Sequence, residues 1–511
     1  KNQKILIFSH STTIATNALL TKQNWPKVAL ITTKGYRDVL EIGRQRRPEI
    51  YNLKVERPVP IVPRELRFVV DERMDANGNV IKPLNLNDLD GILDELKNVD
   101  VIAVSLINSY KNNSHEKLIK DYLSKKLNIP VIISSEIDPL PKEFERTSTT
   151  VVNALLYPIV SKYLKKLEKE VKNLIGNVPI YIMQSDGGLN TIESIIEKPI
   201  SIIESGPSSG VLASLYFSRL LKLKNLLTFD MGGTTAKAGI IYNYNTQYSF
   251  EFEAAGKTHS GRSIKGSGYT VRFPFIDLAE TSSGGGSIAW IDEGNALRVG
   301  PRSAGSYPGP VCYDLGGNEP TITDANLVLG RLNPDHILGG EMKLNFEKAY
   351  NAIKMLSEKI NLDVYETALG IIKIANNQMS KIMRIVSIER GYDPRDFHMI
   401  AFGGAGPLHA VDIASDLNVK SVIIPPNPGL FSALGLVVSD LKREYVKPLM
   451  LEIEKMDDNL IEKLFSEMEE NAIEDFNKSN VKGDVYFIRQ ANMQYLGQGF
   501  ELDITLREKN I

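Results

Sequence analysis

The first 175 residues alternate between short apolar runs and segments in which apolar residues recur every three or four positions. Short apolar runs are typical of buried strands, and the wider spacing is typical of helices with one buried face. Strands are predicted at residues 28–33, 101–106 and 130–133, and helices at 87–97 (with Asn87 as N-cap), 114–127 and 146–174. Strands that alternate with helices in this way predict an α/β unit with a largely parallel sheet.

A second set of elements follows residue 200. Strands are predicted at residues 226–229, 399–402 and 421–424, a hairpin at 238–252, and helices at 346–360, 365–390 and 407–417. Between the hairpin and the first of these helices, residues 256–317 are rich in Gly, Ser and Pro and predict a long irregular region. Such regions in compact proteins are usually functional or mobile. The chain is therefore expected to form two α/β domains with a glycine-rich insertion.

The composition is that of a globular protein, with 42% hydrophobic and 24% charged residues among 511. Lys and Arg (60) nearly balance Asp and Glu (62), so no basic excess would attract nucleic acid or an acidic membrane surface. No apolar run reaches the roughly 18 to 20 residues of a membrane-spanning helix. Cys312 is the single cysteine, which suits a reducing compartment. These features predict a cytoplasmic protein without nucleic-acid or membrane partners.

The two ends of the sequence predict an incomplete chain. Residue 1 is Lys rather than Met, and a strand is expected almost at once. Residues 485–511 have the pattern of strands without a closing element. We therefore expect a truncation at both ends.

The strongest local motif is the segment LLTFDMGGTTAKAGII at residues 226–241. An apolar strand ends at Asp230, a turn of two glycines and two threonines follows, and a second strand begins near Lys237. Glycines let a turn aim its N–H groups at one point, where they can bind phosphate, and Asp at a strand end can hold the water shell of Mg²⁺. The segment is interpreted as a phosphate-binding hairpin, with an ordinary tight turn as the alternative.

A second glycine-rich turn, FGGAGPLH at residues 402–409, follows another apolar strand and opens a helix. Bare backbone at a helix N-terminus can receive a phosphate or the flat face of a ligand. The alternative is a strand-to-helix corner that needs glycine for close packing. Two such turns in separate α/β units point to a nucleotide held between them.

These two motifs resemble those of the hydantoinase A/5-oxoprolinase family, which includes subunits of the acetone carboxylase β type. The resemblance runs from about residue 8 to about residue 503. The other matching segments are HSTTIATNALL at 10–20, GYRDVLEIGRQ at 35–45, SGP at 205–207, GGGSIAWID at 284–292, VGPRSAG at 299–305, PGP at 308–310 and TITDAN at 321–326.

The resemblance implies an actin-like ATPase fold of the sugar kinase and Hsp70 type, with ATP and Mg²⁺ in a cleft between two lobes. Asp230 would bind Mg²⁺. The other implied nucleotide contacts are Gly232, Gly233, Thr234, Thr235 and Lys237 around the phosphates, and Gly403, Gly404, Ala405 and Gly406 in the adenosine motif. The implied domains are an N-terminal-type domain at residues 1–200, without the first phosphate hairpin of the family, a core domain at 201–440, and the start of a C-terminal region at 441–511.

Asp230, His10 and Asp324 form the candidate catalytic set. His10 matches a His-x-Thr-Thr motif of the family and would contact the substrate or the transferred phosphate; the alternative is a structural histidine bonded to a neighbouring carbonyl. Asp324 precedes an apolar helix, so its alternative role is that of an N-cap. His409 is expected only to lie in the first turn of its helix.

The resemblance implies ATP-dependent hydrolysis of a cyclic amide or imide, such as 5-oxoproline or a hydantoin, with this chain as the nucleotide-binding subunit. Transfer of the γ-phosphoryl group to the carbonyl oxygen would give an imidate phosphate that water can open. A hydantoinase B-type subunit would complete the hydrolysis, and an oligomeric assembly is expected. The alternatives are a subunit of an ATP-dependent ketone carboxylase and a non-catalytic actin-like nucleotide-binding protein.

Overall fold

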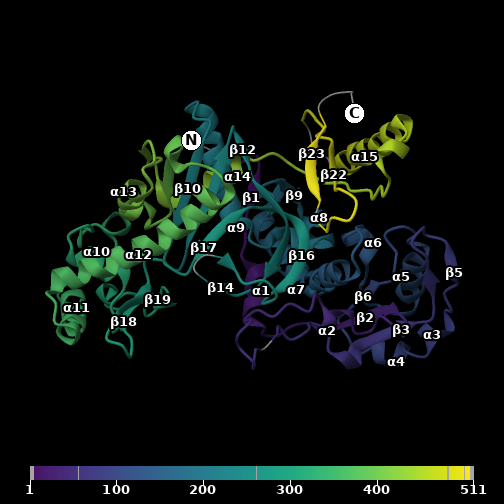
Figure 1. Cartoon of the computed structure of the whole chain (residues 1–511), viewed down its shortest axis with the longest axis horizontal. Helices are drawn as coiled ribbons and strands as arrows, with labels where there is room; N and C mark the ends of the chain where they lie inside the picture. Colours follow the sequence, from purple (N-terminus) through teal and green to yellow (C-terminus); the bar gives the residue numbers. More distant parts are fainter. Residues whose placement is uncertain (1–4, 56, 260–261, 480–482, 500, 507–511) are drawn as a thin grey trace. The chain divides into compact units, whose positions relative to one another are not determined.

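The structure of the chain is a computed structural model that describes residues 5–55, 57–259, 262–479, 483–499 and 501–506 (Figure 1). The chain divides into two compact units, each assembled from separate stretches of sequence. The first unit comprises Lys1–Pro26, Leu40–Ile61 and Leu155–Asp440, and the second comprises Lys27–Val39, Val62–Ala154 and Leu441–Ile511. Both units combine strands and helices, so the predicted α/β class is confirmed.

The second unit is built on a four-stranded parallel sheet in the order β3-β2-β6-β7, as the alternating pattern predicts. Its strands are β2 (Val28–Thr33), β3 (Arg67–Val70), β6 (Val101–Ser105) and β7 (Val131–Ile133), with a small hairpin of β4 (Arg73–Met74) and β5 (Val80–Lys82). Its helices include α3 (Asn87–Asp90), α4 (Leu93–Leu96), α5 (Ser114–Lys126) and α6 (Ser134–Ile137). From the C-terminal stretch come α15 (Asp458–Lys478), β22 (Gln490–Met493) and β23 (Leu502–Thr505), and residues 507–511 lie outside the described part.

The helix predicted at residues 87–97 is two short helices, α3 and α4. Ile92, between them, has φ −117° and ψ 4°, which is not helical. Gly91 precedes it, and glycine weakens a helix interior by roughly 1 kcal/mol relative to alanine. The apolar spacing survives the break because Leu89 and Leu96 both lie in the core.

The main sheet of the first unit has the order β12-β11-β10-β20-β21, with β17 paired to β11. β10 (Leu226–Met231) runs parallel to β20 (His398–Phe402) and antiparallel to β11 (Ala236–Tyr242). The remaining strands are β12 (Asn245–Thr246), β17 (Leu278–Thr281) and β21 (Val422–Ile423). The principal helices are α9 (Ser205–Leu220), α10 (Ile322–Val328), α11 (Phe346–Ile360), α12 (Val364–Val386), α13 (Gly406–Leu417) and α14 (Phe431–Val438), while α7 (Glu143–Ile175) contributes to both units.

A smaller sheet of the first unit joins β1 (Phe8–His10), β8 (Ile180–Met183) and β9 (Leu189–Thr191). The helices α1 (Ile14–Thr21) and α8 (Ile192–Glu197) follow β1 and β9 in the sequence. In this way the segment around His10 is tied to residues about 170 positions later, because β1 pairs with β8.

The expectation of a long irregular region at residues 256–317 is wrong for much of its length. Six strands begin there: β14 (Thr258–His259), β15 (Arg262–Ser263), β16 (Tyr269–Ile276), β17, β18 (Ser287–Ile291) and β19 (Leu297–Ser303), while residues 260 and 261 lie outside the described part. β16 pairs with β13 (Tyr248–Ala254), so the hairpin predicted at 238–252 is divided between two sheets. Glycines and prolines mark the ends of these strands, and their density conceals the short apolar runs between them.

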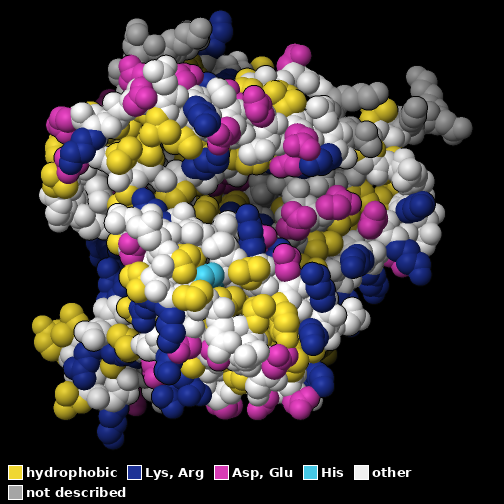
Figure 2. All heavy atoms as spheres, turned by 90° about the vertical axis from the view of Figure 1, so that its right-hand side faces the viewer, with side chains coloured by type: hydrophobic (Ala, Val, Ile, Leu, Met, Phe, Trp, Pro, Cys, Tyr) yellow, Lys and Arg dark blue, Asp and Glu magenta, His cyan; other side chains and the backbone are white. Residues whose placement is uncertain are grey.

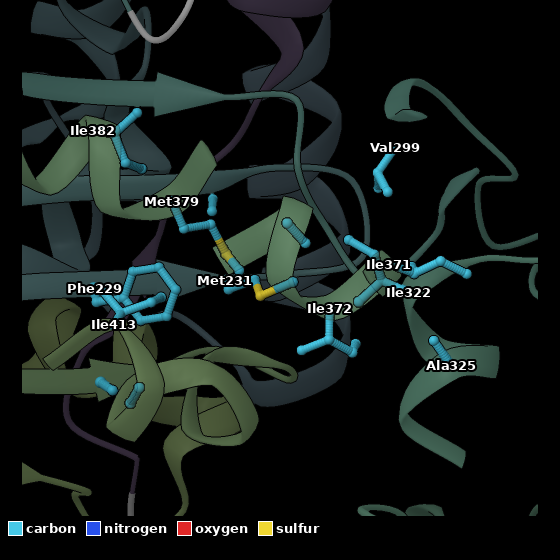
Figure 3. Close-up of a cluster of buried hydrophobic side chains, with 14 of the residues drawn as sticks. Phe229, Met231, Val299, Ile322, Ala325, Ile371, Ile372, Met379, Ile382 and Ile413 are labelled. Carbon is cyan, nitrogen blue, oxygen red and sulfur yellow. The ribbon is translucent and has the colours of Figure 1, made fainter. Parts of the chain in front are cut away.

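A large hydrophobic core fastens the main sheet of the first unit to its helices (Figure 3). Phe229 and Met231, on either side of Asp230 in β10, are fully buried in it. Figure 3 also labels Ile322 and Ala325 of α10, Ile371, Ile372, Met379 and Ile382 of α12, and Ile413 of α13. Burial of one large apolar side chain contributes about 1.5–3 kcal/mol. The strand that carries Asp230 is therefore held firmly in place.

Helices α9 and α14 approach each other so closely that Gly435 has no room for a side chain. A Cβ at Gly435 would lie 1.8 Å from the carbonyl oxygen of Ser209. The substitution Gly435→Ala is therefore expected to lower the free energy of unfolding by about 3 kcal/mol. Gly429→Ala is the matched control, because a Cβ there meets no atom within 4 Å. Urea unfolding of both variants measures the difference, and equal stabilities would show that this helix contact is not tight.

None of the helices in the described part of the chain has both the length and the apolar character that a bilayer crossing requires. Figure 2 shows basic and acidic side chains interspersed on the face that it draws. This mixture agrees with the formal net charge of −2.

Candidate functional site

Two glycine-rich turns of the first unit leave the same edge of the main sheet. β10 and β20 are parallel neighbours, with Asp230 opposite Phe402. The backbone N–H of Ala405 donates to the carbonyl of Met231 at 2.9 Å, which joins the turn after β20 to the end of β10. The two motifs that the sequence assigned to a nucleotide therefore lie side by side in one unit, and the expectation that they belong to separate α/β units is wrong.

A third turn, at residues 284–286, lies against the first. The N–H groups of Gly285 and Gly286 donate to the carbonyls of Gly232 (3.0 Å) and Gly233 (2.7 Å). A Cβ at residue 284 would lie 2.5 Å from the backbone of Thr234, so only glycine allows this approach. The hydroxyl of Thr323, in α10, donates to the carbonyl of Gly285 at 2.8 Å. Three turns and the start of a helix therefore surround the end of β10.

The backbone beside the glycines of the first two turns is open. A Cβ built at Gly232, Gly233 or Gly404 would meet no atom within 4 Å, and none of the three has a left-handed backbone. The fold itself therefore does not require glycine at these positions. What glycine provides there is uncovered backbone, which is the usual surface for a phosphate or a flat ligand. The N–H of Gly232 already donates to the carbonyl of Thr235 (3.1 Å), so the N–H groups of Gly233 and Gly404 are the donors left for a ligand.

The carboxylate of Asp230 lies at this open backbone. No hydrogen bond reaches it from the residues that the structure describes. Burial raises the pKa of Asp230, and the nearby ammonium of Lys237 acts against that rise. A half-buried carboxylate with unused oxygens is costly unless it serves to bind something, and perturbed acids of this kind are concentrated at functional sites.

Lys237, expected at the phosphates, is held between two carboxylates. Its Nζ lies 2.9 Å from Glu204, at the start of α9, and 3.3 Å from Glu280 of β17. Burial alone would lower the pKa of Lys237, but these two carboxylates raise it. For the acid Glu280 the effect of burial has the opposite sign, and its pKa is raised. The sequence analysis missed both acids. A signal existed only for Glu204, which directly precedes the SGP motif.

His10 does not contact the turns around Asp230. Its Nε2 lies 2.7 Å from the hydroxyl of Tyr163 in α7, and burial lowers the pKa of its ring. The same N-terminal segment does reach α9, where the hydroxyl of Thr16 accepts from the N–H of Glu204 at 3.1 Å. His10 is thus linked to the Lys237 cluster through the backbone of its segment rather than by its side chain.

Asp324 is not the N-cap of its helix, as the alternative interpretation expected: the N-cap of α10 is Thr321, and Asp324 is the third residue of the helix. It is fully buried and forms a reciprocal capping box with Thr321. Its carboxylate also accepts from the N–H groups of Val311 (3.2 Å) and Cys312 (2.7 Å). Asp324 therefore fixes the start of α10, which carries Thr323 to the turn at residues 284–286.

Comparison with known proteins identifies the family. The model of the hydantoinase/oxoprolinase family matches residues 146–445, and that of its N-terminal region matches residues 1–127. The chain belongs to the hydantoinase/oxoprolinase family. This membership confirms the resemblance inferred from the motifs.

Individual members of the hydantoinase/oxoprolinase family are similar to this chain over nearly its whole length. An uncharacterised protein of Methanocaldococcus jannaschii is 50% identical over 98% of this chain and 74% of its own length. Caprolactamase subunit alpha of Pseudomonas jessenii is 34% identical over 97% of this chain and 71% of its own. The crystal structure of the ATP-dependent caprolactamase of that organism superposes with a TM-score of 0.83 at 33% identity, covering 97% and 72% of the two chains. A nucleotide-free acetone carboxylase structure gives a TM-score of 0.76 at 27% identity, covering 97% and 72%.

The carboxylate of Asp230 can be compared with what a metal ion requires. Within the described ranges, no group of three or more His, Cys, Asp and Glu side chains is arranged to hold one. Mg²⁺ needs few protein ligands, because it keeps several waters and takes others from phosphates. The unpaired carboxylate oxygens of Asp230 fit that requirement.

His409 is expected to make the protein less stable in mild acid. Its buried ring donates from Nδ1 to Asn376 (2.7 Å) and accepts at Nε2 from Asn326 (3.2 Å), which requires the neutral form. Burial, helped by Arg331 and opposed by Asp412, lowers the pKa of His409 to about 4. The unfolded chain, with a pKa near 6.5, therefore takes up the proton first, so stability falls as the pH drops from about 6.5 to about 4.

The loss through His409 is on the order of 3 kcal/mol when the window is crossed completely. Urea unfolding at a series of pH values measures it. The variant His409→Gln should be less stable at pH 7 and should lack this part of the pH dependence. A pH profile unchanged by the substitution would assign the acid sensitivity to other groups.

Proposed function

We propose that this chain is the nucleotide-binding subunit of an enzyme that uses ATP to activate a cyclic amide or imide, on an actin-like ATPase fold. The observation that carries the proposal is the open backbone at Gly232, Gly233 and Gly404 beside the unpaired carboxylate of Asp230. Donor N–H groups without a covering side chain suit phosphates, and a free carboxylate suits Mg²⁺. The relatives agree with this chemistry, since one of them is named an ATP-dependent caprolactamase.

In this proposal the hairpin around residues 232–235 binds the phosphates. The backbone N–H groups and the hydroxyls of Thr234 and Thr235 are the donors, and Asp230 holds Mg²⁺ and orients the reacting oxygen. Mg²⁺, when bound, supplies positive charge against the phosphates. The turn at residues 403–406 receives the adenosine.

The chemical purpose is to make an amide carbon electrophilic. When the carbonyl oxygen of the ring attacks the γ-phosphorus, the bond to ADP breaks and an imidate phosphate forms. Water then adds to the carbon, the ring C–N bond breaks with the nitrogen leaving as an amine, and an acyl phosphate remains. A second water hydrolyses this acyl phosphate to a carboxylate and phosphate. The residues of this chain position the reactants and neutralise charge in the first step, and a B-type partner subunit carries out the hydrolysis. We propose 5-oxoproline or a hydantoin as the substrate.

The remaining candidate residues receive distinct roles. Lys237, whose charge is taken up by Glu204 and Glu280, positions the hairpin rather than neutralising the phosphates. Asp324 is a positioning residue that acts through its neighbour Thr323. His10 is kept as the contact to the substrate or transferred phosphate, with Tyr163 fixing its ring.

A second candidate function is that of a subunit of an ATP-dependent ketone carboxylase. The observation in its favour is the likeness to acetone carboxylase over 97% of this chain. The phosphate-binding residues would be the same, because a ketone enolate and bicarbonate would be phosphorylated instead of an amide.

ADP release tests the proposal. The full chain, with and without its B-type partner, is given 5-oxoproline, hydantoin, N-methylhydantoin, caprolactam, or acetone with bicarbonate. Stimulation by one cyclic amide, lost in Gly233→Ala, supports amide activation and names the substrate. Stimulation by acetone only with bicarbonate moves the assignment to the carboxylase. If no compound changes ADP release by the assembled subunits, the proposal fails and a non-enzymatic nucleotide-binding role replaces it.

A further inference from the structure

A pocket in the second unit opens at the carboxyl edge of its parallel sheet. Its volume is about 330 Å³, and it is formed by the β4–β5 hairpin, the loop after β6 and the segment after β7. The labels β5, β6 and α6 mark this region in Figure 1. Ligands of α/β sheets bind outside the carboxyl ends of the strands, and this volume falls within the range of small-molecule sites. The lining residues that matter below are Tyr110, Lys111, Asn113 and Ser135.

The side chains that line the pocket offer donors without partners. Among the described residues, no hydrogen bond or ion pair engages the ammonium of Lys111, the amide of Asn113 or the hydroxyl of Tyr110. The hydroxyl of Ser135 is buried and also lacks a partner. An unsatisfied buried hydroxyl costs about 1–3 kcal/mol, which a ligand that accepts a hydrogen bond would offset. No carboxylate lines the pocket.

A buried acid close in sequence to these donors already has hydrogen-bond partners of its own. The fully buried carboxylate of Glu116 accepts from the N–H of Leu106 (2.9 Å), the hydroxyl of Ser134 (2.6 Å) and the N–H of Ser135 (2.9 Å). With three donors on one carboxylate, its negative charge is directed into the protein. It therefore does not occupy the side chains of Lys111, Asn113 or Tyr110.

A buried arginine makes the walls of the pocket rigid. Arg146, which is fully buried, donates to the carbonyl of Leu106 (2.6 Å) and to the hydroxyl of Ser134 (3.2 Å). Its guanidinium also lies 5.3 Å from the centre of the Tyr110 ring. Satisfied buried networks of this kind hold a site in one geometry before the ligand arrives.

We propose that this pocket binds a small molecule through an oxyanion, a carboxylate or a phosphate. Lys111 supplies the charge, and the side chains of Ser135 and Asn113 supply hydrogen bonds. Helix α5 has 13 residues and begins directly after Asn113, so the partial positive charge of its N-terminus adds to that of Lys111. The pocket lies entirely within the second unit, and the proposal does not depend on the ATP-dependent function.

Protection of Lys111 from chemical modification tests this site in the full chain. Lysines are modified by reductive methylation and quantified by peptide mass spectrometry, with increasing inorganic phosphate, acetate or glycerol and with ionic strength held constant by chloride. Lys117 is the internal control, because it is an exposed lysine in α5 outside the pocket lining. We expect phosphate or acetate to slow the modification of Lys111 at least threefold and to leave that of Lys117 unchanged. Protection by phosphate alone would show that the pocket binds a phosphate group, and protection by acetate alone would show that it binds a carboxylate.

Two variants separate binding from folding. Ser135→Ala removes a hydroxyl that has no partner, so stability should be retained while the anion concentration for half-protection rises at least threefold. Asn113→Asp places a carboxylate in the pocket at a helix N-cap, where Asp favours the helix, so the protein should fold but lose the protection. Equal effects on Lys111 and Lys117, equal protection by glycerol, or full protection in Asn113→Asp would each overturn the proposal.

Discussion

Replacement of Asp230 by Asn is expected to reduce substrate-stimulated ADP release by about 100-fold or more, a loss typical of an acid or base removed from the reacting centre. Asn keeps the size of the side chain but removes the charge that would hold Mg²⁺ and orient the reacting oxygen. The stability of the Asp230→Asn protein, in contrast to its activity, should not decrease. Since burial raises the pKa of Asp230, the ionised carboxylate destabilises the folded state at neutral pH. The variant should therefore unfold at the same temperature as the parent protein or higher.

The combination of lost activity and retained stability is what distinguishes a functional acid from a structural one. Asp416→Asn, the same change at an exposed aspartate of α13 that pairs with Arg384, is the matched control and should change neither quantity strongly. ADP release with the partner subunit and the thermal unfolding midpoint are measured on both variants. An Asp230→Asn protein that keeps its activity would contradict the proposed site, and one that unfolds early would give Asp230 a structural role.

The parts of the fold that the sequence predicts well are those with local causes. The strand at residues 28–33 and the helix at 346–360 are found as β2 and α11, because their apolar spacing alone decides which face is buried. β16 was missed because its partner β13 and the turns between them cannot be deduced from a short window. Pairing between distant strands is a property of the whole chain, so local patterns leave it open.

The candidate site divides in the same way. Its glycine turns were recognised because each stands directly after an apolar strand, and the parallel pairing of β10 with β20 then places them side by side. Glu280 was missed because only the pairing of β11 with β17 brings it opposite Lys237. Glu204 was missed although it directly precedes the SGP motif, because the motif alone does not show that its carboxylate reaches Lys237. That ion pair also changes the reading of Lys237, from a free cation to one held between two carboxylates.

Two adjacent glycines in the turn after β20, Gly403 and Gly404, differ in whether the fold itself requires glycine. Gly403 has φ +83°, and a Cβ there would lie 2.4 Å from the carbonyl oxygen of Met231 and 2.5 Å from Oδ1 of Asp230. Gly404 has neither a left-handed backbone nor an atom within 4 Å of its Cβ position. One residue is glycine because the fold leaves no alternative, whereas the other has no structural reason for being so.

Gly403→Ala is therefore expected to lower the free energy of unfolding by about 3 kcal/mol, from backbone strain and overpacking together, and to displace Asp230. Gly404→Ala should keep full stability or gain up to about 1 kcal/mol, because alanine restricts the unfolded chain. Its methyl group, however, would occupy the space proposed for the nucleotide, and we expect ATP affinity to fall about tenfold, or about 1.4 kcal/mol. Urea unfolding and ATP titration of both variants give the four values. If Gly404→Ala binds ATP as tightly as the parent chain, this turn does not contact the nucleotide, and the open backbone beside it needs another explanation.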